Sequence, residues 1–337
     1  QEIDIKGFLM RRFYRIFPPL VFMILITLPF TLFIRKDFVA SIGTQIAGAL
    51  GFVTNFYEML SGGNYESQFI PHLFVHTWSL ALEVHYYILW AIAVWFIAKK
   101  SRTVGQFRGM IFLVSTGVFL FSFLSMFISG FFTKNFSLIY FSSWTHIFPF
   151  FAGTALATIS GVKNVGANFK KLEKSWSLQQ TLGMIVGSFV VLLLLGFLLR
   201  FDNIFTYLVG FLLATIAALI MILGARVLHE KTPQLEEPIW VTFIADTSYG
   251  VYLFHWPFYI IFSQLVGNIF AVLITTILSF AFAAVSFYIL EPVLAGRKQD
   301  LFGIQMDVKS IARPIFYSLI PLGIICFLIT VTAPKVG

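Results

Sequence analysis

Long apolar stretches alternate with short polar ones along most of this chain. A run of about 20 apolar residues is long enough to cross a bilayer, and the pattern predicts nine such spans. They lie at 17–34, 79–98, 110–131, 139–160, 181–199, 204–224, 243–263, 267–290 and 315–332. Helices are expected, because backbone in contact with lipid must satisfy its own hydrogen bonds. The sequence therefore predicts an all-α, polytopic transmembrane helix bundle, with 1–337 as a single membrane domain.

A tenth segment, 38–57, is less apolar and is interrupted by Gly, Thr, Ser and Gln. We interpret it as re-entrant or interfacial. The distribution of positive charge supports this, because Lys and Arg collect on the cytoplasmic side of membrane proteins. With nine spans and a cytoplasmic N-terminus, most of the 23 Lys and Arg residues are cytoplasmic. If 38–57 spanned, every later loop would change sides. The charges thus predict that residues 58–78 and the C-terminus lie outside the cell.

Composition agrees with a membrane protein: 58% of the residues are hydrophobic and 11% are charged. A water-soluble globular domain is far more polar. We attribute the net charge of +8 to inner-face Lys and Arg residues, so the expected partners are membrane lipids and not nucleic acid. The single cysteine, Cys326, cannot form an intrachain disulfide.

Polar residues follow one face of the helix predicted from HTWSLALEVHYYILW, His76 to Trp90. Ser79, Glu83, Tyr86 and Trp90 are spaced by four, three and four residues, and His76 extends the face. An ionisable group within a membrane is costly, and it usually faces the interior and marks a site. A structural pairing of Glu83 with a basic residue of another helix is the alternative.

A second polar stripe occurs in DTSYGVYLFHWPFYIIF, Asp246 to Phe262. Ser248, Tyr252 and His255 recur at helical spacing in an otherwise apolar span, shortly before Pro257, where a kink is expected. This arrangement favours the lining of a polar path over an isolated structural histidine.

Two histidines, His72 and His76, have the four-residue spacing of a helical metal pair. Two ligands alone are weak evidence, and no metal site is predicted.

Charged residues are expected at the cytoplasmic ends of two spans. Arg11, Arg12 and Arg15 precede the first span. They could fix the topology and bind anionic lipid, or they could bind the phosphate groups of a phosphorylated donor molecule in the cytoplasm. Glu291 ends the eighth span, where the helix dipole disfavours a carboxylate. It is predicted to form a structural ion pair with a basic group.

Five segments together resemble the acyltransferase 3 family of integral membrane O-acyltransferases. In the family's order they are RRFYRIFPPL, HTWSLALE, YFSSWTHIFPFFAGTALA, SYGVYLFHWPF and YILEP, and they cover positions 11 to 292. YILEP differs from the usual pattern in that Pro follows Glu directly.

The resemblance implies that an acyl group moves from cytoplasmic acyl-CoA, with acetyl-CoA expected, to a hydroxyl of a surface glycan in a bacterial plasma membrane. Peptidoglycan is the first expectation for the acceptor; lipopolysaccharide or another exported polysaccharide is the alternative. Family members usually open with two further spans that carry a presumed catalytic His. The layout also resembles the subgroup fused to an extracellular SGNH-hydrolase-like domain. We therefore expect this chain to be a fragment.

The resemblance also suggests roles for the polar residues. The expected cofactor-binding residues are Arg11, Arg12 and Arg15. The expected catalytic residues are Glu83, His255, Tyr252 and Ser79. The expected substrate path comprises His76, Trp78, Ser248 and Tyr249. A transporter that uses an intramembrane Glu/His path, or a scaffold without chemistry, would show the same stripes but not the five ordered motifs.

Overall fold

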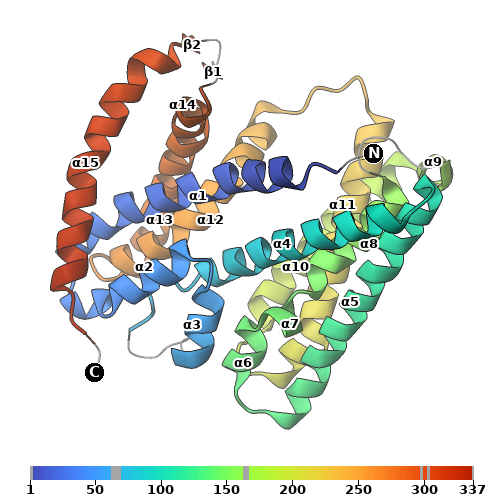
Figure 1. The fold of residues 1–337 in the computed structure, drawn as a ribbon, viewed down its shortest axis with the longest axis horizontal. Helices are drawn as coiled ribbons and strands as arrows, with labels where there is room; N and C mark the ends of the chain where they lie inside the picture. Colours follow the sequence, from blue (N-terminus) through green and yellow to red (C-terminus); the bar gives the residue numbers. More distant parts are fainter. Residues whose placement is uncertain (1–2, 62–69, 162–166, 297–298, 302–303, 336–337) are drawn as a thin grey trace. The chain divides into compact units, whose positions relative to one another are not determined.

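The computed structural model describes residues 3–61, 70–161, 167–296, 299–301 and 304–335. These ranges are almost wholly helical, as Figure 1 shows, and they divide into two compact units. The first comprises Gln1–Ile5 and His85–Glu236, and the second comprises Lys6–Val84 and Glu237–Gly337. The prediction of an all-α polytopic bundle is confirmed. A short antiparallel hairpin of β1, Gln299–Leu301, and β2, Ile304–Met306, is an addition that the sequence did not predict.

The first unit begins within α4, Thr77–Lys100, whose later part belongs to it. Its further helices are α5 Val104–Phe132, α6 Phe136–Phe141, α7 Ser143–His146, α8 Phe148–Ser160, α9 Ala167–Ser175, α10 Leu178–Leu198, the π-helical turn η3 Thr206–Gly210 and α11 Phe211–Lys231. Met126, Ile139, Phe148 and Tyr207 form the buried core among α5, α6, α8 and η3. Side chains cap three of these helices, because Thr103 accepts a hydrogen bond from Gln106 N, Asn135 accepts one from Leu138 N and Ser177 forms a capping box. Such caps satisfy amide groups that have no partner inside the helix.

The span predicted at 139–160 is divided into α6, α7 and α8. Side chains near the breaks bond to backbone carbonyls that a continuous helix would use. Thr145 Oγ1 donates to Ile139 O at 2.6 Å, and His146 Nδ1 lies 2.6 Å from Tyr140 O. Pro149 lacks an amide proton, which suits the first turn of α8. Side-chain hydrogen bonds therefore replace helical ones at these breaks.

The second unit contains α1 and the C-terminal helices. Its elements are α1 Ile5–Phe30, the 3-10 turns η1 Thr31–Phe33 and η2 Lys36–Val39, α2 Ile42–Leu50, α3 Thr54–Ser61, the start of α4, α12 Ile239–Ser263, α13 Asn268–Val285, the π-helical turn η4 Ser286–Leu290, α14 Glu291–Ala295, the β1–β2 hairpin and α15 Val308–Thr332. Aromatic rings join α1, α12 and α13; for example, Phe22 contacts Phe254 at 5.8 Å and Phe254 stacks on Phe282 at 5.5 Å. Gly250 of α12 lies directly against Ala283 of α13, and the two helices run side by side in Figure 1.

The segment 38–57 folds back within the second unit. The amide of Ser41 donates to Pro334 O, beyond the C-terminal end of α15. From there α2 runs to Phe52, whose ring contacts Phe17 at 6.4 Å. Phe17 lies about 20 Å before the end of α1, at ~1.5 Å per residue, and α3 follows directly after the turn. The arrangement is a short helical hairpin, 42–61, which we call the re-entrant hairpin after the sequence interpretation; whether it is re-entrant or interfacial in the membrane stays a prediction.

Within the described residues, seven helices are long and apolar enough to cross a membrane. The predicted spans 139–160 and 243–263 are not among them: the first is broken, and α12 is long but carries several polar side chains. Large apolar side chains on the long helices are highly exposed, for example Phe197 at 86% and Ile269 at 84%. Exposed apolar surface of this extent is suited to contact with lipid.

Candidate functional site

A pocket of about 610 Å³ lies between the start of α1 and the end of the α13–α14 helix pair. Arg11, Arg12 and Arg15 line it together with Glu291. The arginines are already on the helix, because α1 begins well before them, and the Arg12 guanidinium lies over the ring of Phe8 at 5.6 Å. Three guanidinium groups and one carboxylate leave this arginine pocket positively charged, and its size is typical of small-molecule sites. It can therefore accept phosphate oxygens.

Tyr249 connects the arginine pocket with α4. Its hydroxyl donates to Ile16 O at 2.8 Å, one residue beyond Arg15. The carboxylates of Glu83 and Glu291 and the Arg15 guanidinium all act electrostatically on this phenol. The structure thus brings Glu83, Tyr249 and Glu291 to one region. The structural ion pair of Glu291 stays a prediction, although Arg15 acts on its carboxylate.

Two predicted catalytic hydroxyls contact one another. Tyr252 Oη donates to His76 O at 2.6 Å, and Ser79 Oγ lies 2.8 Å from Tyr252 Oη. Ser79 Oγ also lies 3.3 Å from His76 O. The two hydroxyls therefore share one hydrogen-bond network: because Tyr252 Oη gives its proton to His76 O, it is the acceptor for Ser79 Oγ.

His76 is buried at the start of α4, with 1% exposure. Its Nε2 lies 2.8 Å from Leu253 O, so Nε2 carries the proton and donates, and Nδ1 is the basic atom. Within the described part of the chain, Nδ1 has no hydrogen-bond partner. Burial, and then the nearby His255, lower the pKa of His76 to about 3. The imidazole is therefore neutral at physiological pH.

His255 lies beside His76, with ring centroids 5.9 Å apart. Its Nδ1 lies 2.7 Å from Tyr252 O and 3.1 Å from Val251 O, so Nδ1 donates and Nε2 is the acceptor atom. In contrast to His76, this side chain is exposed. The two histidines thus present a buried and an accessible basic nitrogen close together.

The surroundings of the other predicted residues differ. Ser248 is exposed and its hydroxyl donates to Ala245 O of its own helix, at 2.8 Å. Trp78 is buried in the core with 7% exposure. Farther along α4, Tyr86 and Trp90 pack against aromatic rings of α8 in the first unit. The polar face predicted for α4 is therefore divided: its start contributes to the second unit and its later part to the first.

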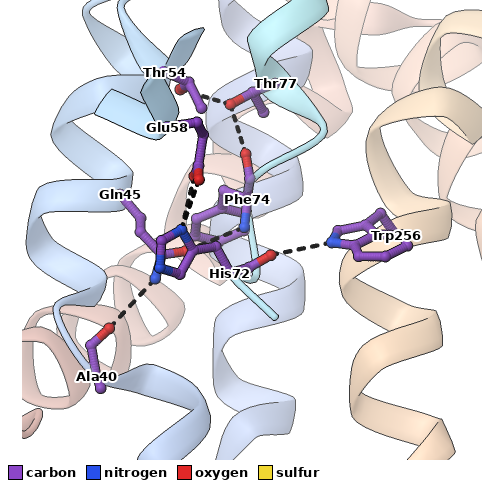
Figure 2. A network of polar contacts seen from close by, with 8 residues as sticks. All are labelled: Ala40, Gln45, Thr54, Glu58, His72, Phe74, Thr77 and Trp256. Atoms are coloured by element: carbon purple, nitrogen blue, oxygen red, sulfur yellow. Dashed lines mark hydrogen bonds and ion pairs between the residues drawn. The ribbon is translucent and has the colours of Figure 1, made fainter. Parts of the chain in front are cut away.

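A buried carboxylate–imidazole pair was not predicted from the sequence. Glu58 of α3 is fully buried, and its two oxygens lie 2.8 and 2.9 Å from His72 Nδ1; Figure 2 shows the two groups facing one another. The Trp256 indole donates to His72 O at 3.1 Å. The available signal was the four-residue spacing of Glu58 from Thr54, which places both on one face of a short helix. Residues 62–69 of the predicted outer segment 58–78 lie outside the described residues.

The described residues contain no group of three or more His, Cys, Asp and Glu side chains that could hold a metal ion. His72 and His76 bond to different partners, Glu58 and Leu253 O. Their four-residue spacing does not produce a shared site.

Comparison with known proteins identifies the family. Residues 2–294 match the acyltransferase domain of the acyltransferase 3 family. The chain belongs to this family. The match extends through both units and includes the arginine pocket, Tyr252 and the Glu58–His72 pair. Membership of an acyltransferase family favours an enzyme over a transporter.

Relatives of this chain occur in Staphylococcus aureus. O-acetyltransferase OatA of strain NCTC 8325 / PS 47 is 26% identical over 264 residues, which are 76% of this chain and 41% of OatA. A putative O-acetyltransferase of strain COL is 27% identical over 259 residues, covering 75% of this chain and 41% of the relative. The chain thus spans about two fifths of the length of these relatives. No solved structure matches it.

Proposed function

We propose that this chain is the membrane part of an O-acyltransferase. It moves an acetyl group from cytoplasmic acetyl-CoA to a hydroxyl of a cell-surface glycan, with peptidoglycan as the acceptor. One observation carries the proposal: polar side chains of the second unit follow one another from the arginine pocket through Tyr249 and the Ser79–Tyr252 hydroxyls to His76. Polar groups within a membrane are costly, and a connected series of them marks a path.

On the donor side, Arg11, Arg12 and Arg15 hold the phosphates of the acyl donor. Guanidinium groups bind phosphate oxygens in pairs of parallel hydrogen bonds, which also fix orientation. The positive-inside distribution of Lys and Arg supports a cytoplasmic position for this pocket. Glu291 keeps the arginines extended into the pocket by attracting Arg15.

In the path itself, the Ser79 hydroxyl donates a hydrogen bond to the acyl carbonyl oxygen as charge develops on it, while Tyr252 Oη keeps its own proton on His76 O. His255 is accessible and lines the path beside these hydroxyls, whereas His76 is buried, and its pKa of about 3 makes it too weak a base to take a proton from an attacking hydroxyl. Glu83 acts electrostatically on the Tyr249 phenol, whose position is fixed by its hydrogen bond to Ile16 O. The hydrogen bond from Tyr252 Oη to His76 O keeps the Tyr252 ring in place beside Ser79.

The identity of the transferred group and the identity of the acceptor are supported by different observations. The relatives' names contain O-acetyltransferase, which supports acetyl as the transferred group. The ordered motifs and membrane layout support peptidoglycan. The long apolar helices and the bacterial relatives support a bacterial plasma membrane as the location, and the distribution of Lys and Arg supports a cytoplasmic position for the N-terminal end of α1.

Binding of acetyl-CoA to inverted membrane vesicles tests the donor site. Arg12→Ala and Arg15→Ala should each weaken binding about 10- to 100-fold, since a charge-assisted hydrogen bond contributes ~1.5–3 kcal/mol. Arg35→Ala is the matched control, because Arg35 is exposed and pairs with Asp37 outside the pocket. Equal binding by all three variants would contradict the proposal.

Ester formation tests the path. Glu83→Gln in the full-length protein should lower base-labile acetate on the isolated cell wall while membrane insertion stays normal. A wild-type level of ester in a correctly inserted variant would exclude the role given to Glu83. Uptake of a solute by proteoliposomes without ester formation would favour a transporter.

A further inference from the structure

The Glu58–His72 pair has the geometry of an oriented base. Both carboxylate oxygens of Glu58 lie within 2.9 Å of His72 Nδ1. An ionised carboxylate only accepts hydrogen bonds, so Nδ1 carries the proton and Nε2 of the neutral ring holds the basic lone pair. The Glu58 side chain is 1% exposed, whereas that of His72 is 27% exposed. The pair is therefore asymmetric, with a buried orienting carboxylate and an accessible imidazole, as in catalytic carboxylate–histidine pairs.

A network of hydrogen bonds fixes both partners (Figure 2). Thr54 and Thr77 share a hydrogen bond of 2.8 Å, which ties α3 to the start of α4. Gln45 of α2 accepts from Phe74 N at 3.3 Å and donates to Ala40 O at 3.3 Å. Together with the bond from the Trp256 indole, these contacts hold the segment that carries His72 against the re-entrant hairpin. A base that is fixed in this way loses little freedom on binding substrate.

The position of the pair suits the acceptor side of the membrane. Glu58 lies on α3, the arm of the re-entrant hairpin that follows Phe52, and His72 is four residues before His76 in the chain. In the proposed topology this hairpin enters from the outer face. Tyr57 stacks obliquely near His72, with ring centroids 5.5 Å apart. Burial and the Glu58 carboxylate raise the pKa of Tyr57, so the phenol keeps its proton and leaves His72 as the base of this group.

We propose that His72 is the base that deprotonates the acceptor hydroxyl, and that Glu58 is its positioning residue. This inference rests on the proposed function and adds the acceptor side to it. His72 Nε2 takes the hydroxyl proton, and the oxygen attacks the acyl carbonyl carbon. The bond from that carbon to its carrier sulfur or oxygen breaks, and the electron pair leaves with the carrier. The carrier takes a proton from water, and the imidazolium releases one to water, which restores neutral His72.

The substitution His72→Gln separates this role from a structural one. Its amide can still donate to the Glu58 carboxylate, but it cannot take up a proton. We expect base-labile acetate on the cell wall to fall at least 10-fold in cells that produce the full-length variant, since general bases contribute about 10²–10⁴-fold. His85→Gln is the matched control, because His85 bonds to Ser143 in the first unit, and it should keep wild-type ester. A wild-type level in His72→Gln would overturn the proposal.

Chemical rescue provides the second measurement. External imidazole should restore ester formation in His72→Ala, while pyrazole, which has the same shape but is far less basic, should not. Equal restoration by both compounds would show that His72 only fills space. Adding Glu58→Gln to His72→Ala should lower activity little further, because a positioning residue acts through the base that is already absent; a fully additive loss would contradict the role of Glu58.

Acetyl-CoA binding distinguishes failure of this inference from failure of the proposed function. His72→Gln should bind acetyl-CoA in inverted vesicles as the wild type does. If the wild type binds acetyl-CoA and forms ester while His72→Gln does the same, only the acceptor-side base is refuted. If the wild type forms no ester, the proposed function itself fails.

Discussion

Gly250→Ala should separate α12 from α13 and thereby displace the hydroxyls of α12. A Cβ atom at Gly250 would lie 2.5 Å from the Cβ and 2.7 Å from the Cα of Ala283. Non-bonded carbon atoms prefer about 3.5–4.0 Å, so the two helices would have to move apart by about 1 Å. Overpacking of this kind costs about 1–3 kcal/mol. Because Tyr249 and Tyr252 lie within one turn of Gly250, their hydrogen bonds to Ile16 O and His76 O should lengthen as well.

Gly323→Ala is the matched control for this substitution. Gly323 lies inside α15 of the same unit, and nothing lies within 4 Å of an added Cβ. There the change should stabilise by up to about 1 kcal/mol through helix propensity. Thermal unfolding in detergent should therefore rank Gly250→Ala below wild type and Gly323→Ala at or above it. A separation of about 1–3 kcal/mol corresponds to several degrees, at ~2–4 °C per kcal/mol.

A second substitution tests whether the contact itself is responsible. Ala283→Gly removes the nearer of the two clashing atoms but leaves the Cα, so it should restore part of the stability and ester formation of Gly250→Ala. The double variant would then show a favourable coupling energy. If Gly250→Ala unfolds at the same temperature as Gly323→Ala, or if Ala283→Gly gives no recovery, the close contact of α12 and α13 does not determine the stability of this unit or the positions of the α12 hydroxyls.

Three further predictions concern polar side chains and use four substitutions. Tyr252→Phe removes the hydrogen bonds to His76 O and Ser79; it should destabilise by about 1–2 kcal/mol but lower wall-bound acetate more than 10-fold. Tyr288 donates to Asp246 at 2.9 Å, so Asp246→Ala should destabilise by ~1.5–3 kcal/mol and Asp246→Asn, which keeps an acceptor oxygen, by less in the same thermal assay. The pKa of His76 is lowered to about 3, so below pH ~6.5 the unfolded chain binds a proton that the folded chain excludes. Stability should fall as the pH drops from about 6.5 toward 4, and His76→Gln should reduce that fall.

Helices and their polar faces were predictable because both depend on local spacing. Ser79 and Tyr252 were each assigned to a polar stripe on an apolar helix, and the structure joins them directly although they lie far apart in the sequence. The reason is the cost of an unsatisfied hydroxyl in an apolar environment, which drives two such groups together. Their catalytic roles stay predictions. The arginine pocket was predictable in part. The spacing of Arg11, Arg12 and Arg15 places them on one side of a helix, but their proximity to Glu291 could be known only from the fold.

The interruption at 139–160 could not be predicted from hydropathy. The segment is apolar enough on average to suggest a span, and its breaks depend on which carbonyls its polar side chains reach. Thr145 and His146 each bond to a carbonyl six residues earlier, which no helical pattern provides. Hydropathy measures the cost of transferring side chains and does not record such backbone alternatives.

The comparison of Glu83 with Glu58 explains why a second charged site was missed. Glu83 interrupts a long apolar run, so the free-energy cost of burying its carboxylate is evident from the sequence, and a partner is expected. Glu58 follows a weakly apolar segment and resembles a residue of a solvated loop. It becomes costly only because the re-entrant hairpin buries it, and the hairpin is defined by distant contacts, such as that of Phe52 with Phe17. A buried carboxylate requires a compensating donor, and His72 supplies it from the other side of the loop. In a membrane protein with a re-entrant segment, functional side chains should therefore be sought in the adjoining loops as well as in the spans.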